Sequence, residues 1–139
     1  MKLQILTQEQ EPIGGFKTLI IERNNLDLSE ISDNECEVIL ASDAMDSVSY
    51  SSAEQLVAAF ITKLRLNGEL IVGGTDVRLF SKAVFNGQIS PEEASNTVTN
   101  VHSMTNGEQM KEIFTKMGLE VQSSYLDGLH YEIKAKRVE

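Results

Sequence analysis

The sequence predicts an α/β fold in which a mostly parallel sheet ends in an antiparallel β-hairpin. Three short apolar runs, at residues 18–21, 38–41 and 70–72, are continuous rather than alternating, which is typical of parallel strands buried on both faces. An amphipathic stretch with helical spacing separates the second run from the third. Residues 131–136 instead alternate between apolar and charged side chains. These three observations together indicate βαβ units followed by a hairpin.

The length and charge of the chain restrict its organisation and its partners. Its 139 residues carry no visible repeat or linker, so we expect residues 1–139 to form a single domain. A formal net charge of −9 disfavours nucleic acids and anionic membranes as partners, because their phosphate groups would be repelled. The single cysteine, Cys36, excludes an internal disulfide and a cysteine-built zinc site, and we expect no metal. With neither a secretion signal nor a bilayer-length apolar run in the sequence, the expected location is cytoplasmic.

The first predicted βαβ unit contains the clearest helix of the sequence. Its apolar stripe is formed by Leu56, Val57, Phe60, Ile61 and Leu64. Ser51 or Ser52 is expected to cap the start of this helix, and Gly68 is expected to end it in a left-handed conformation. Residues 3–6 form a weaker, alternating strand candidate ahead of the three continuous runs.

Further helix and turn signals follow the third apolar run. Residues 90–93 (SPEE) are a helix start with serine as the cap, and Asp76 is favoured as the cap of the helix before it. Another helix is expected to begin near Thr105, with Glu108 completing a capping box. The dipeptide at 127–128 (DG) separates the last two strands and is typical of a hairpin turn.

This order of elements resembles the C-terminal two-thirds of a class I S-adenosylmethionine (SAM)-dependent methyltransferase. The similar stretches are LDLSEI (26–31), DNECEVILAS (33–42), KLRLNGELIV (63–72) and MGLEV (117–121). The resemblance covers about residues 18–137. It implies a three-layer Rossmann-like methyltransferase fold, with a seven-stranded sheet that has helices on both faces. It also implies that SAM binds at the carboxyl ends of the first strands, where the strand order reverses.

The N-terminus departs from the family pattern. The family has a glycine-rich loop after its first strand, because only glycine lets the backbone approach the cofactor closely. Here residues 3–6 are followed by TQEQE (7–11), and the glycines at 14–15 come just before the next strand. About 11 residues separate these strands, too few for a crossover helix with its turns. The sequence is therefore interpreted as an N-terminally shortened member that lacks the glycine-rich loop and whose first helix is reduced or missing.

The resemblance also implies roles for four polar residues. Glu22 would bind the ribose hydroxyls of SAM, Asp27 would contact the adenine amine, and Ser42 would help to hold the cofactor. Asp43 would be the catalytic residue that faces the methyl acceptor. The alternatives are structural: Glu22 is a solvated charge at a strand end, Asp27 forms a turn or helix cap, and Asp43 only begins a loop. His102 is either a general base or, as we favour, a hydrogen-bonded structural residue.

Two functions are compatible with these observations. The first is a SAM-dependent methyltransferase that transfers a methyl group to an unidentified small-molecule or protein acceptor. The alternative is a catalytically inactive binding or scaffold module with the same fold. Loss of the first helix would leave one face of the sheet uncovered, so a homo-oligomer is expected under either hypothesis.

Overall fold

The computed structural model describes residues 1–7 and 10–139, and in these ranges it contains one six-stranded sheet and four α-helices. The strands are β1 (Lys2–Leu6), β2 (Lys17–Ile20), β3 (Cys36–Ala41), β4 (Leu64–Thr75), β5 (Leu119–Asp127) and β6 (His130–Arg137). The helices are α1 (Ala53–Lys63), α2 (Val77–Phe85), α3 (Pro91–Asn100) and α4 (Gly107–Lys116), and two 3-10 helices, η1 (Ala44–Ser47) and η2 (Tyr50–Ser52), precede α1. In the described ranges, no helix combines the length and the apolarity needed to span a membrane.

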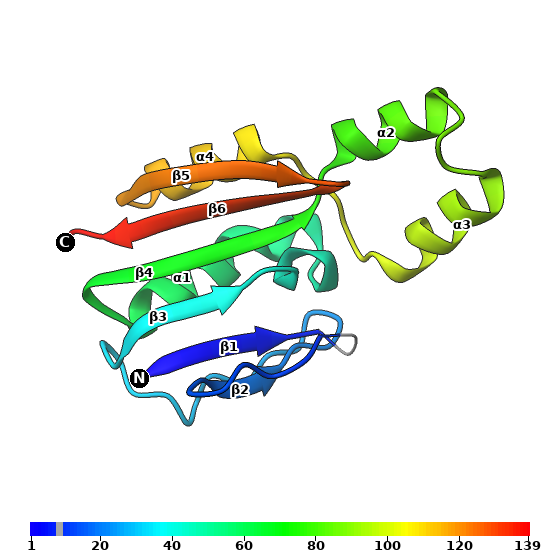
Figure 1. Ribbon diagram of the computed structural model, residues 1–139. Coiled ribbons are helices and arrows are strands. Elements are labelled where there is room, and N and C mark those ends of the chain that lie inside the picture. Colours follow the sequence, from blue (N-terminus) through cyan, green and yellow to red (C-terminus); the bar gives the residue numbers. More distant parts are fainter. Residues whose placement is uncertain (8–9) are drawn as a thin grey trace.

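The strands are arranged in the order β2-β1-β3-β4-β6-β5 (Figure 1). Strand β1 pairs in parallel with β2 and β3, and β3 pairs in parallel with β4. Strand β6 runs antiparallel to both of its neighbours, β4 and β5. The predicted α/β class, with a mostly parallel sheet that ends in a hairpin, is confirmed. The sheet has six strands rather than the seven that the resemblance implies.

The helices that pack on the sheet cover one of its faces. Buried side chains of α1 and α4 belong to one apolar cluster with alternate residues of the strands, including Val57, Phe60, Phe114, Ile39, Val72 and Ile133. On the opposite face Val38, Leu40 and Ile71 are half-buried, and no helix in the described ranges lies over them. Helices α2 and α3 instead project beyond the end of the sheet (Figure 1). The second helical layer of the expected fold is thus not formed, consistent with a missing first helix.

The described residues between β1 and β2, residues 7 and 10–16, form no helix, although a helix would stand here in a complete βαβ unit. Gln4 of β1 lies on the sheet face opposite α1, and it is buried. Its Nε2 donates to the carbonyl oxygen of Glu11 at 3.2 Å, and its Oε1 accepts from the backbone N–H of Ile13 at 2.8 Å. The side chain thereby satisfies two backbone groups of a segment that has no ladder of its own. Gln4 fastens the loop to the open face of the sheet.

The first continuous apolar run does not become an interior strand. Strand β2 lies at the edge of the sheet, and Ile20 is 59% exposed. The interior position beside β3 belongs to β1, the weaker candidate. The prediction that residues 18–21 are buried on both faces is therefore wrong. A short apolar run gives no information on whether a helix will cover it, and here none does.

The start and end of α1 also differ from the prediction. Ser52 is the N-cap residue, but its side chain makes no capping hydrogen bond. The helix ends at Lys63, and Gly68 lies inside β4, where Asn67 has the positive φ of 66°. The register between β3 and β4 shifts at Cys36, so the extra residues form an irregular stretch of strand instead of a helix cap.

Side-chain caps are formed at the three later helices. Ser90 accepts a hydrogen bond from the N–H of Glu93, which confirms the predicted start of α3. Asp76 caps α2 and is buried. The cap of α4 is Asn106 rather than Thr105, because the Asn106 side chain accepts from the N–H three residues later. The boundary prediction for α4 was wrong by one residue.

Candidate functional site

Several strand ends meet at one edge of the sheet. The carboxyl ends of β1, β3 and β4 lie there together with the start of the antiparallel strand β6. The strand order reverses at β1, which has β2 on one side and β3 on the other. In open α/β sheets, ligands bind in the crevice outside the carboxyl ends of the strands at such a reversal. This edge is therefore the candidate functional site.

Glu22 and Asp27 lie in the exposed segment that follows β2. The backbone N–H of Glu22 donates to the carbonyl oxygen of Asn25 at 3.0 Å, which forms a tight turn, and the Glu22 side chain is exposed. Asp27 Oδ1 accepts from the N–H of Ser29 at 2.9 Å. Hydrogen bonds from Ser29 hold the pKa of Asp27 below its usual value. The carboxylate of Asp27 is thus engaged in an Asx-type turn.

Ser42 and Asp43 directly follow β3 at the candidate edge. The carbonyl oxygen of Ser42 lies so close to Gly73 of β4 that a Cβ at residue 73 would overlap it. The carbonyl oxygen of Tyr131, on β6, crowds the same position from the other side. Glycine at residue 73 therefore allows three strand backbones to approach one another, and this approach fixes where Ser42 and Asp43 lie.

Asp43 is hydrogen-bonded across the reversal of strand order. Its Oδ2 accepts from Gln10 Nε2 at 2.8 Å, and Gln10 Oε1 accepts from the backbone N–H of Thr7 at 3.0 Å. The other carboxylate oxygen of Asp43 lies 3.5 Å from Nδ1 of His130. Asp43, Asp46 and His130 form a cluster: each contributes one carboxylate oxygen or imidazole nitrogen, and these three atoms lie within 4.8 Å of one another. The loop after β1, the turn after β3 and the start of β6 are thus joined by polar contacts.

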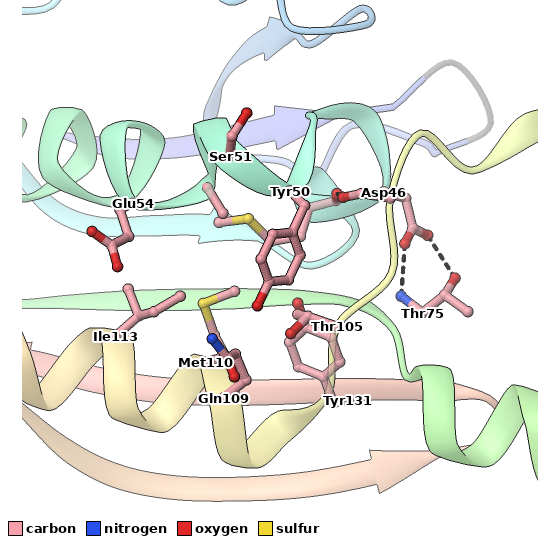
Figure 2. Close-up of a pocket in the computed structure, with 13 residues that line it drawn as sticks. Asp46, Tyr50, Ser51, Glu54, Thr75, Thr105, Gln109, Met110, Ile113 and Tyr131 are labelled. Atoms are coloured by element: carbon pink, nitrogen blue, oxygen red, sulfur yellow. Dashed lines mark hydrogen bonds between the residues drawn. The ribbon is translucent and has the colours of Figure 1, made fainter.

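Asp46 fastens η1 to the end of β4. Its Oδ1 accepts from the backbone N–H of Thr75 at 2.6 Å, and its Oδ2 accepts from the Thr75 hydroxyl at 3.0 Å (Figure 2). Burial raises the pKa of Asp46 above its usual value, and the hydrogen bonds from Thr75 only partly offset this effect. Asp46 is therefore the perturbed carboxyl group at this edge, and perturbed groups are often found at functional sites.

A cavity of about 280 Å³ opens beside Asp46. Figure 2 shows Tyr50 and Ser51 on one wall and Gln109, Met110 and Ile113 of α4 on the facing wall. The remaining lining residues are Met45, Asp46, Ala53, Glu54, Thr75, Ser103, Thr105 and Tyr131. These side chains come from six separate stretches of sequence, so no motif in the sequence could have indicated the cavity. Asp46, Thr75 and Tyr131 are the residues that the sequence analysis missed.

None of the four predicted site residues lines this cavity. Glu22, Asp27 and Ser42 lie apart from it, whereas Asp43 lies close to one lining residue, Asp46, in the cluster that also contains His130. The backbone N–H of His102 donates to the carbonyl oxygen of Asp46 at 2.7 Å. The backbone of His102 therefore helps to hold the wall in place, while its imidazole Nε2 lies 3.2 Å from Asn24 Nδ2.

No family model matches the chain, and no curated protein matches its sequence. Solved structures do match. A SAM-dependent methyltransferase from Archaeoglobus fulgidus superposes with a TM-score of 0.61 at 12% identity, over 96% of this chain and 75% of the other. A SAM-dependent methyltransferase from Thermotoga maritima, described as a possible histamine N-methyltransferase, superposes with a TM-score of 0.59 at 19% identity, over 88% and 65%. The fold is that of the class I SAM-dependent methyltransferases.

A third structure with this methyltransferase fold contains a cofactor product. It is the 1,6-didemethyltoxoflavin-N1-methyltransferase of Burkholderia thailandensis with S-adenosylhomocysteine bound, and it matches with a TM-score of 0.57 at 12% identity. This chain spans 61% of the length of that enzyme. At such identities the likeness shows the fold. The resemblance predicted from the sequence is confirmed at that level.

Proposed function

We propose that this chain is a SAM-dependent methyltransferase that acts on a small molecule held in the cavity beside Asp46. The observation that carries the proposal is the position of this cavity. It is lined by Asp46, whose carboxylate lies in the cluster with Asp43 and His130, at the carboxyl edge where a methyltransferase fold binds SAM. The bound S-adenosylhomocysteine of the Burkholderia neighbour supports the choice of cofactor.

The residues near the reversal would hold SAM, which supplies an electrophilic methyl group. Glu22 fits this role because its exposed carboxylate follows β2 and could accept hydrogen bonds from both ribose hydroxyls. Ser42 and Asp27 would make the remaining contacts to SAM. The Asp27 carboxylate already accepts a hydrogen bond from the N–H of Ser29, so it would bind the cofactor while keeping or giving up that bond. The bridge that Gln10 forms between Thr7 and Asp43 crosses the same reversal. Binding of SAM would therefore have to displace the Gln10 side chain.

His130, oriented by Asp43, would remove the proton of the methyl acceptor. A carboxylate beside one imidazole nitrogen orients the ring and leaves the other nitrogen available as a base. As the acceptor nitrogen or oxygen forms its bond to the methyl carbon, the bond from that carbon to the sulfonium of SAM would break and S-adenosylhomocysteine would leave, while the N–H or O–H proton of the acceptor would pass to His130. The cavity walls would add orientation and exclusion of water, which account for much of the rate enhancement in transfers of this kind.

Calorimetric titration of the full chain with SAM and S-adenosylhomocysteine tests this proposal. We expect binding in the micromolar to millimolar range, and we expect Glu22→Ala to weaken it several-fold. Glu92→Ala, which removes an exposed carboxylate of α3, is the matched control and should leave the affinity unchanged. No heat and no thermal shift at millimolar cofactor would contradict the enzyme. An unchanged affinity in Glu22→Ala would contradict the ribose contact.

The alternative is a catalytically inactive binding module, and the Gln10 bridge is the observation that favours it. The Gln10 side chain already joins the segment after β1 to the turn after β3, so the protein's own contacts occupy the place where the cofactor would bind. The open face of the sheet would then bind a second copy of the chain through Val38, Leu40 and Ile71. Sedimentation velocity would detect the resulting dimer, and a monomer at high concentration that binds SAM would exclude the module.

A further inference from the structure

The Tyr131 hydroxyl is the most unusual polar group of the cavity. Tyr131 is only 1% exposed, and its hydroxyl has no hydrogen-bond partner among residues 1–7 and 10–139. A buried hydroxyl without a partner carries the full cost of its desolvation, so such groups are rare unless a ligand or water completes them. Because Tyr131 is one of the residues that line the cavity, a ligand bound there is a candidate for the missing partner.

The position of this hydroxyl places the missing partner close to Asp46. A Cβ atom at Gly74 would lie 3.2 Å from the Tyr131 hydroxyl oxygen and 3.2 Å from Asp46 Oδ1, so both oxygens lie beside Gly74, and both residues line the cavity. Each carboxylate oxygen of Asp46 has a second lone pair besides the one used by Thr75. Burial, with Asp46 as a further cause, raises the pKa of Tyr131, so its hydroxyl remains protonated and neutral. The pair can therefore bind a group that carries N–H donors.

The charge and size of the cavity further restrict the chemical class of ligand that it can bind. Its lining residues include two acids, Asp46 and Glu54, and no Lys, Arg or His. Glu54 is paired with Lys116 at 3.5 Å, which leaves Asp46 as the unneutralised charge of the cavity wall. The rest of the lining is largely apolar, and Met110 and Tyr50 lie on facing walls (Figure 2). At about 280 Å³ the cavity is near the lower limit of small-molecule sites, which are about 300–1,000 Å³.

We propose that this cavity binds a small aromatic amine, whose nitrogen donates to Asp46 and pairs with the Tyr131 hydroxyl while its ring lies between Tyr50 and Met110. An anionic ligand of the same size is disfavoured, because its charge would face the Asp46 carboxylate. The inference rests on the proposed function only in making this amine the methyl acceptor, since the binding itself needs no cofactor. It therefore specifies the acceptor class: a compound with one ring and a primary or secondary amine.

Three probes with the same body test the proposal without SAM. Phenethylamine, phenethyl alcohol and hydrocinnamate differ only in whether the polar end is cationic, neutral or anionic. We expect the amine, titrated into the isotope-labelled full chain, to shift the backbone resonances of Tyr50, Met110 and Ile113. Hydrocinnamate should bind at least about tenfold more weakly, because its carboxylate would face Asp46. Equal binding of the amine and the acid, or shifts confined to residues outside the cavity, would overturn the proposal.

Two variants make the test specific. Tyr131→Phe should weaken phenethylamine binding by about five- to tenfold, the effect of losing one hydrogen bond. Tyr125→Phe is the matched control, because the Tyr125 hydroxyl is bonded to Glu132 on the exposed surface and does not line the cavity. An affinity that Tyr131→Phe leaves unchanged would contradict the assignment. Failure of SAM to bind while the amine still binds would refute the proposed function and leave the cavity assignment intact.

Discussion

The two halves of the sheet differ in how their faces are covered. Strands β3, β4 and β6 pack against α1 and α4, and their inward-facing side chains are almost completely buried. At the other end β2 is an exposed edge strand, and a loop fastened by Gln4 takes the place of a crossover helix. Asp46, whose pKa is raised, and its cavity belong to the helix-covered half, whereas Glu22 and Asp27 belong to the loop-joined half.

This difference indicates which half of the molecule holds polar groups at fixed positions before a ligand binds. Helices α1 and α4 supply rigid walls, and a rigid wall can hold a buried hydroxyl or carboxyl at a fixed place. The loop-joined half offers carboxylates on turns: Glu22 is exposed, and Asp27 is exposed and bonded to Ser29. Under the proposed function, the acceptor side of the site would thus be built in advance, and the cofactor side would be completed on binding.

The largest expected effect tests whether the helix-covered half carries the stability. Phe60 of α1 is fully buried in the apolar cluster, so Phe60→Ala should lower the free energy of unfolding by about 3–5 kcal/mol. Phe85 at the end of α2 is 90% exposed, and Phe85→Ala should change it by less than about 0.5 kcal/mol. Urea unfolding of both variants provides the measurement. Similar losses in the two variants would show that burial against the helix-covered half does not carry the stability.

A smaller effect is expected from the loop-joined half. Gln4→Ala removes both contacts to the loop and leaves the N–H of Ile13 and the carbonyl of Glu11 without partners, which should cost about 1–3 kcal/mol. Hydrogen exchange at Ile13 should accelerate. Gln122→Ala, at an exposed position of β5, is the control with the same chemical change. If Ile13 remained protected in Gln4→Ala, the loop would be held by something other than this side chain.

The smallest effect concerns the pH dependence of the two perturbed carboxyl groups. The pKa of Asp46 is raised in the folded state, so the native protein binds this proton more tightly than the unfolded chain. Its contribution to stability is present below the usual value of 3.8 and is lost as the pH rises through the higher folded pKa. Asp46→Asn should abolish this loss, because an amide can keep both bonds to Thr75 if the Thr75 hydroxyl then accepts.

Asp27→Asn provides the control of opposite sign. The pKa of Asp27 is lowered, so its contribution is present above 3.8 and is lost as the pH falls through the lower folded value. Unfolding curves from about pH 3 to 7 should therefore separate the two variants from the wild type in opposite directions. The same direction for both would show that burial does not dominate at Asp46.

Local patterns in the sequence predicted much of the fold. The hairpin, the parallel strands and the caps at Asp76 and Ser90 follow from periodicity and from hydrogen-bonding preferences that act within a few residues. The edge position of β2 did not follow, since it depends on a helix that the neighbouring connection does not form. For the same reason the irregular stretch before Gly68 was predicted as a helix cap, although pairing with β3 decides its conformation.

The candidate site was predicted less well than the fold. Asp43 was singled out because it follows a strand, and the structure places it in the cluster with Asp46 and His130. The cavity residues could not be found this way, because they come together only where the start of α1, the end of β4, α4 and β6 meet in the fold. Tyr131 in particular is one of several alternating apolar residues in the sequence, and only its burial without a partner distinguishes it.

The crowding at Gly73 has a consequence for how this protein can change by mutation. Even the single methyl group of alanine would force the backbones of β3 and β6 apart, and the turn that carries Ser42 and Asp43 would move with them. In a library covering every substitution, residue 73 should tolerate almost nothing, while the exposed Gly14 should accept many replacements. The geometry of the candidate functional edge would thus depend on residue 73, a position without a side chain.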